Sequence, residues 1–202
     1  MFGITAAICV GAVLGFFFRN DFLIANSDKV VSFGLCLLLF FVGMDIGNSG
    51  DIFPKLKKFG KKIWFLPIST IVGSLLGGYA GSLITTLSTG QGIAVSAGLG
   101  WYSLSAIELS KISAELGSLA FLTNVLRELL AIFSVPLIAK YIGSLESVSV
   151  AGATAMDTLL PIINKNNSAD VAIVAFFSGI VLTTAVPFLV TLCVSIFNLN
   201  LI

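Results

Sequence analysis

Four charged side chains stand in stretches of the sequence that are otherwise apolar. They are Asp45, Arg127, Glu128 and Asp157. A charge at the centre of a bilayer costs roughly 2.5–3.5 kcal/mol on insertion scales, so such a residue generally relays a proton, holds a cation or pairs with another charge. We therefore expect Glu128 and Asp157 to line a substrate or ion path. We expect Asp45 on the same path; because it comes late in its apolar run, a position near the cytoplasmic interface is the alternative.

Arg127 and Glu128 are neighbours along one predicted helix. Side chains at i and i+1 leave a helix about 100° apart, so these two charges are poorly placed to neutralise each other. Asn124 lies three residues before Arg127 and four before Glu128, and the three side chains form one polar flank. We expect Arg127 to pair with an acid from another segment, with Asp157 as the best candidate. The alternative is that these charges only pair internally and orient the helices.

Three neighbouring side chains in a short segment could bind a substrate cation. Trp101, Tyr102 and Ser103 supply aromatic faces and a hydroxyl group, and an aromatic face attracts an ammonium group. Anchoring at the membrane interface is the alternative role for the two aromatic residues.

Nothing in the sequence supports catalysis or a metal site. There is no histidine, and the three cysteines, Cys9, Cys36 and Cys193, stand apart in apolar runs. Because neither a paired cysteine spacing nor a nucleophile with a neighbouring base is present, we predict no disulfide framework, no metal, no cofactor and no enzymatic activity. A net charge of +1 gives no indication of nucleic-acid binding.

The elements that must position these side chains are membrane helices. Of the 202 residues, 57% are hydrophobic and only 10% are charged, whereas a soluble domain carries about 25% charged residues. So little charge cannot cover the surface of a soluble domain of this size. We therefore predict an all-α integral membrane protein, with a single polytopic domain over residues 1–202 and lipid as its main solvent.

Residues 1–90 are predicted to hold three membrane helices, at 3–18, 30–48 and 63–87. The loop at 49–62 is rich in lysine, and short lysine-rich loops remain cytoplasmic, which places the N-terminus in the cytoplasm. In the third helix, Gly73, Gly77 and Gly81 recur every four residues. Such a stripe allows another helix to approach closely, either from this chain or from a second subunit.

Residues 91–202 show a weak internal repeat. Two short segments rich in small residues, at 92–107 and 148–163, are each followed by a long apolar span, at 117–142 and 171–197. We predict that the short segments are re-entrant and enter from opposite faces, as in the inverted repeats of many transporters. The total is then about five full spans plus two re-entrant segments, with the C-terminus outside. Seven spans are the alternative, if both short segments cross.

Three motifs in a fixed order indicate a family. They read GLGWYSLS at 98–105, NVLRELLAI at 124–132 and GATAMDTLLP at 152–161. Together they resemble the lysine exporter family LysO, from about residue 30 to the end and most strongly from residue 92. The resemblance implies export of L-lysine and its analogues across the cytoplasmic membrane. It also implies that Glu128 matches an intramembrane acid that is important in the family, with proton exchange there as the expected coupling.

Family members commonly carry a further N-terminal membrane portion with its own acidic residue, and this chain begins near where that portion would end. The resemblance therefore implies that a separate small membrane protein supplies those helices, or that this chain acts alone or as a homodimer. We expect the separate partner. Two other functions stay open: an organic-anion or sodium-coupled carrier in which Arg127 binds the substrate, and a non-transporting subunit of a membrane complex.

Overall fold

The computed structural model describes residues 2–17, 26, 29, 32–34, 36–37, 40–41, 43–44, 47–48, 57, 60 and 62–199. The chain divides into two compact units, Met1–Phe41 and Val42–Ile202. The first unit contains helix α1, Phe2–Phe17, in agreement with the helix predicted at 3–18. Most of the predicted span at 30–48 and of the loop at 49–62 lies outside the described residues, and so does Asp45.

Three long helices frame the second unit. They are α4 (Lys62–Ile84), α7 (Ala114–Tyr141) and α10 (Ala169–Ile196). Each is long and apolar enough to cross a membrane, and α7 and α10 have 28 residues each. At 1.5 Å per residue, 28 residues reach about 42 Å, which exceeds a hydrocarbon core of about 30 Å. Every regular element in the described part of the chain is helical, which confirms the all-α prediction.

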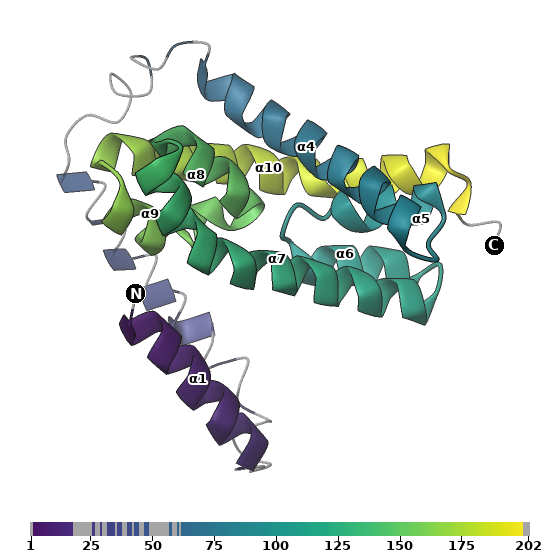
Figure 1. Cartoon of the computed structure of the whole chain (residues 1–202), viewed down its shortest axis with the longest axis horizontal. Helices are drawn as coiled ribbons and strands as arrows, with labels where there is room; N and C mark the ends of the chain where they lie inside the picture. Colours follow the sequence, from purple (N-terminus) through teal and green to yellow (C-terminus); the bar gives the residue numbers. More distant parts are fainter. Residues whose placement is uncertain are drawn as a thin grey trace. The chain divides into compact units, whose positions relative to one another are not determined.

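Two broken elements lie between the long helices. The first hairpin consists of α5 (Thr89–Ser96) and α6 (Tyr102–Ser110), and the second consists of α8 (Ser144–Ala151), the 3-10 helix η1 (Gly152–Met156) and α9 (Leu160–Asn166). Each starts where the preceding long helix stops and returns to that same end (Figure 1). Because α7 separates them, the two hairpins enter from opposite ends of the unit.

A side-chain hydrogen bond joins the two ends of the second hairpin. Nδ2 of Asn167, just after α9, donates to Oγ of Ser147 in α8 at 3.2 Å. The start and the return of this element therefore lie side by side, as the re-entrant prediction requires. Neither short segment crosses as one continuous helix, which is what the seven-span alternative would need.

The tips of the two hairpins meet at a point that we call the crossing. There the backbone N–H of Ala153 donates to the C=O of Leu99 at 3.0 Å. The chain turns sharply on both sides of this bond, with φ of +50° at Leu99, +104° at Gly100 and +65° at Gly152. Positive φ values of this kind favour glycine, since a Cβ restricts the backbone there.

Gly152→Ala is expected to destabilise the crossing strongly. A Cβ at this position would lie 2.5 Å from the C=O oxygen of Leu99 and 3.0 Å from Nη2 of Arg127. The left-handed backbone costs an L side chain about 1–2 kcal/mol, and overpacking adds about 1–3 kcal/mol, so the total is about 2–5 kcal/mol. Thermal unfolding of the detergent-purified protein measures this loss.

Gly77→Ala in α4 is the matched control. No described atom lies within 4 Å of a Cβ built at Gly77, and alanine is favoured over glycine inside a helix by up to about 1 kcal/mol. We expect this variant to unfold at or slightly above the wild-type temperature. If Gly152→Ala and Gly77→Ala unfold at the same temperature, close backbone contact at the crossing does not contribute to the stability of the protein.

Helix α4 approaches α5 through a glycine that is not part of the predicted stripe. A Cβ on Gly78 would lie 2.5 Å from the C=O oxygen of Gly92 and 2.1 Å from Oγ of Ser96. By contrast, no described atom lies within 4 Å of a Cβ at Gly73, Gly77 or Gly81. The predicted stripe is therefore not used for packing within the described part of the chain.

Candidate functional site

The side chain of Asn124 in α7 forms hydrogen bonds to the first hairpin. Its side chain is 2% exposed. Oδ1 accepts a hydrogen bond from the N–H of Gly100 at 2.8 Å, and Nδ2 donates to the C=O groups of Val95 at 3.2 Å and Ala120 at 2.9 Å. A broken helix leaves backbone groups without partners at its ends, and this amide satisfies two of them.

Glu128 and Asp157 are brought together by Thr158. The hydroxyl of Thr158 donates a short hydrogen bond to Oε1 of Glu128. The backbone N–H of Thr158 donates to Oδ1 of Asp157 at 2.6 Å, and Oγ1 lies 3.4 Å from the same oxygen. We call these three half-buried residues the acid cluster. It joins α7 to the tip of the second hairpin, because Asp157 and Thr158 directly follow η1.

Tyr102 is the residue of the first hairpin that lies at this site. It is the first residue of α6, and its ring packs edge-on against Phe121 of α7 with 5.5 Å between the ring centroids. It lies within electrostatic range of both Glu128 and Asp157. The residues on either side of Tyr102 in the sequence have other surroundings. Trp101 packs against the apolar core, and Ser103 is exposed on α6.

Arg127 points away from the acid cluster. Its Nη1 donates to Oγ of Ser74 in α4 at 3.1 Å. No ion pair joins Arg127 to Asp157, although the structure describes both side chains. The predicted pairing of these two residues is therefore wrong. The reason is the helix geometry, since side chains at i and i+1 diverge and Asp157 lies on the side of Glu128.

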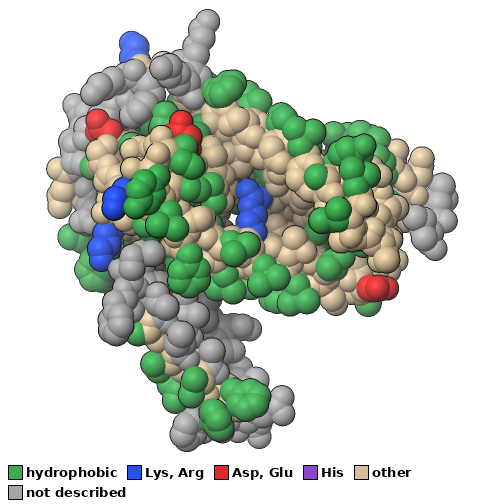
Figure 2. Space-filling view, in the orientation of Figure 1, with side chains coloured by type: hydrophobic (Ala, Val, Ile, Leu, Met, Phe, Trp, Pro, Cys, Tyr) green, Lys and Arg blue, Asp and Glu red, His purple; other side chains and the backbone are tan. Residues whose placement is uncertain are grey.

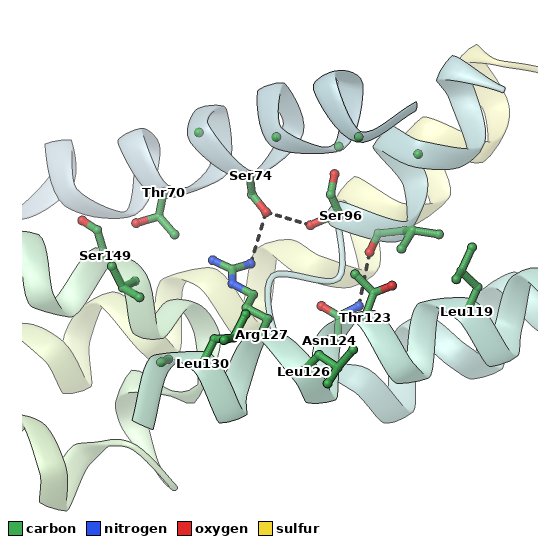
Figure 3. A pocket seen from close by; sticks show the side chains of 18 of the residues that line it. Thr70, Ser74, Ser96, Leu119, Thr123, Asn124, Leu126, Arg127, Leu130 and Ser149 are labelled. Atoms are coloured by element: carbon green, nitrogen blue, oxygen red, sulfur yellow. Dashed lines mark hydrogen bonds between the residues drawn. The ribbon is translucent and has the colours of Figure 1, made fainter. Parts of the chain in front are cut away.

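A cavity of about 800 Å³ opens beside Arg127, between α4, α5, α7 and α8. Figure 2 shows basic side-chain atoms inside a hollow on this face, and Figure 3 shows the guanidinium pointing across the cavity toward Ser74. We call this space the Arg127 cavity. Many of its lining residues carry a hydroxyl group: Ser69, Thr70, Ser74, Thr85, Ser96, Thr123 and Ser149. No Asp or Glu lines it among the described residues.

Comparison with known proteins identifies the family. A family model described as lysine exporter LysO matches residues 5–194. The chain belongs to the lysine exporter LysO family. The resemblance found in the three motifs is thereby confirmed, and the match begins earlier than the expected residue 30. LysO proteins are transporters, so family membership also confirms the prediction that the chain is not an enzyme.

Two LysO relatives are similar over most of the chain. A putative lysine exporter of Haemophilus influenzae is 32% identical over 185 residues, which cover 91% of this chain and 93% of that protein. Lysine exporter LysO of Escherichia coli is 30% identical over 186 residues, which cover 91% of this chain and 62% of that protein. The chain therefore spans less than two thirds of the length of the E. coli protein. No solved structure matches.

Two polar residues of this LysO chain were not singled out from the sequence. Thr158 holds the acid cluster together, and Ser74 is the hydrogen-bond acceptor for Arg127. The position of Thr158 directly after Asp157 was a usable signal, because a hydroxyl beside a buried acid can bond it. Ser74 carried no such signal, since it is one of several hydroxyl residues along the apolar run of α4, with Ser69, Thr70 and Ser82.

Proposed function

We propose that this chain exports L-lysine and its analogues across the cytoplasmic membrane, with the acid cluster and Tyr102 on the substrate path. The observation that carries this proposal is the pair of carboxylates held together by Thr158 where α7 meets both hairpins. Lysine has two ammonium groups, so two carboxylates match its charge, and the ring of Tyr102 adds a face that attracts cations. The names of both relatives support the same substrate.

The hairpins supply the means of alternating access in this proposal. Non-helical backbone is tolerated at membrane depth where it lines a cavity or is buried in protein. Many secondary transporters place such broken helices at the interface of two inverted repeats, and binding takes place where they meet. The opposite entry of the two hairpins and the contact of their tips support this arrangement here.

Lysine counterflow in proteoliposomes tests the proposal. Vesicles that contain the purified chain are loaded with unlabelled lysine, and the uptake of labelled external lysine is measured against protein-free vesicles. We expect saturable lysine uptake that unlabelled lysine competes away. The same assay is repeated with the chain isolated from native membranes together with any bound partner. If neither preparation takes up lysine, lysine export is rejected.

A carrier of organic anions is the second candidate. The observation in its favour is Arg127, whose guanidinium lies in a cavity that no described acid lines. The same vesicles decide between the two, because exchange of labelled succinate without exchange of lysine would identify an anion carrier. If neither compound moves and Glu128→Gln disturbs assembly, the chain is a non-transporting subunit.

We also propose that a proton exchanges with the substrate at Glu128. Because Thr158 donates to Oε1 of Glu128, it stabilises the charged carboxylate that attracts an ammonium group. Thr158→Val keeps the shape and removes the donor, and we expect initial lysine counterflow to fall about 10-fold. Thr158→Ser restores the hydroxyl and is expected to recover most of the rate. A valine variant with the wild-type rate would show that this hydrogen bond is dispensable.

The placement of the chain in the membrane and its partners belong to the same proposal. A cytoplasmic lysine-rich loop places the N-terminus in the cytoplasm and, with five full spans, the C-terminus outside. A separate small membrane protein or a second copy of this chain completes the exporter. Cysteine labelling from each side of the membrane tests the orientation, and purification from native membranes tests the partner.

A further inference from the structure

We propose that the Arg127 cavity is a second binding site, which takes the carboxylate of the transported amino acid. This inference depends on the proposed lysine export. The acid cluster cannot bind the negatively charged carboxylate of lysine, and this inference assigns that carboxylate to Arg127, which leaves α7 about 100° away from Glu128.

Among the residues that the structure describes, the charge of Arg127 is incompletely satisfied. A guanidinium has five N–H donors, and its recorded acceptor is a single neutral hydroxyl, Oγ of Ser74. The residues that the structure describes around the cavity include no acid. A carboxylate bound in two-point fashion is the ligand that the planar guanidinium fits best.

The cavity has the size and lining for an amino acid. Its volume of about 800 Å³ lies within the range of about 300–1,000 Å³ that is typical of small-molecule sites. Hydroxyl groups from four helices face it together with Arg127, and Figure 3 shows Thr70, Ser74, Ser96, Thr123 and Ser149 from these helices. The hydroxyl groups of Ser69, Thr70 and Ser96 donate to carbonyl groups of their own helices, and the rest of the lining is mostly apolar and suits the aliphatic chain of lysine.

Arg127 also touches the element that carries the acid cluster. A Cβ on Gly152 would lie 3.0 Å from Nη2 and 3.2 Å from Cζ of Arg127, so the guanidinium lies directly against the tip of the second hairpin. Asp157 and Thr158 follow on that same hairpin a few residues later. A carboxylate bound by Arg127 in the cavity would therefore lie close to the hairpin that holds the acids.

Lysinamide provides the probe for this site, because it keeps both amino groups of lysine and lacks only the negative carboxylate. In wild-type proteoliposomes, unlabelled lysinamide is expected to compete with labelled lysine at least about 10-fold less well than lysine itself, the effect of one lost hydrogen bond to a charged group. Equal competition by the two compounds overturns the inference and leaves lysine export intact. Absence of lysine exchange in wild type rejects the proposed export and this inference with it.

Two variants test whether Arg127 causes the preference for lysine over lysinamide. In Arg127→Gln, lysine exchange is expected to fall about 10-fold to 100-fold while lysinamide exchange is retained, so that the two compounds become equivalent. Lys140→Gln is the matched control, because Lys140 lies on the same helix, is exposed and does not line the cavity. It is expected to keep the wild-type preference.

Two results would assign Arg127 another role. If Arg127→Gln lowers the exchange of both compounds equally, the counter-charge is a carboxylate of a protein segment and the inference fails. If the variant keeps the wild-type preference for lysine, the carboxylate is recognised elsewhere and the inference also fails. Should Arg127→Gln not fold, the wild-type competition and the charge-conserving Arg127→Lys, which is expected to retain a reduced preference, still decide the question.

Discussion

Glu128→Gln is expected to abolish lysine counterflow, with a loss of about 100-fold or more in the initial rate. Glutamine is close in shape to glutamate, and its side-chain oxygen can still accept the hydrogen bond from Thr158. What disappears is the negative charge that would attract an ammonium group, and with it the proposed site of proton exchange. The measurement is uptake of labelled lysine into loaded proteoliposomes, per amount of folded protein.

Glu115→Gln is the control for this prediction. Glu115 lies in the first turn of the same helix, is exposed and takes no part in the acid cluster. The same substitution there is expected to leave the lysine counterflow rate unchanged. If Glu128→Gln transports lysine as fast as Glu115→Gln, the acid cluster is not on the substrate path.

Asn124→Ala is expected to lower the melting temperature by about 5–15 °C. The substitution leaves the N–H of Gly100 and the C=O of Val95 without their side-chain partner. The unsatisfied N–H of Gly100 costs about 1–3 kcal/mol, and the lost bond to Val95, whose C=O still accepts from the N–H of Gly98, adds about 0.5–1.5 kcal/mol. The total is about 1.5–4.5 kcal/mol, and 1 kcal/mol shifts the melting temperature of a domain of this size by about 2–4 °C. Thermal unfolding in detergent measures the change.

Asn166→Ala provides the comparison for Asn124→Ala. Asn166 is exposed on α9, and its Nδ2 donates only to the C=O of Ile162 in its own helix. The same substitution there removes no contact between elements, and we expect a shift of about 1–2 °C at most. A similar, small shift in both variants would mean that the crossing does not depend on the Asn124 amide.

The long helices and the broken elements could be predicted because their signals are local. The spans predicted at 63–87, 117–142 and 171–197 agree with α4, α7 and α10 within a few residues. The short segments predicted at 92–107 and 148–163 are broken in the structure, the first into α5 and α6 and the second into α8, η1 and α9. Length, hydropathy and glycine content are all readable without any knowledge of packing.

The partners of the charged residues could not be predicted in the same way. The sequence showed that Arg127 and Glu128 diverge on α7, but not which segment lies on each side. Ser74 is 53 residues from Arg127, and Thr158 is 30 residues from Glu128. Such long-range contacts depend on how the hairpins fold back, which local pattern does not determine.

The two hairpins touch through main-chain atoms at the crossing, and this has a consequence for their relative motion. One neutral hydrogen bond, from Ala153 to Leu99, contributes about 0.5–1.5 kcal/mol net, which is comparable to one or two units of thermal energy. Each hairpin is held separately, α6 against α7 and α8 against α7, by packing along the helix. Leu99 and Ala153 are also buried in one apolar cluster, so a relative movement of the tips must break this hydrogen bond and separate that packing as well.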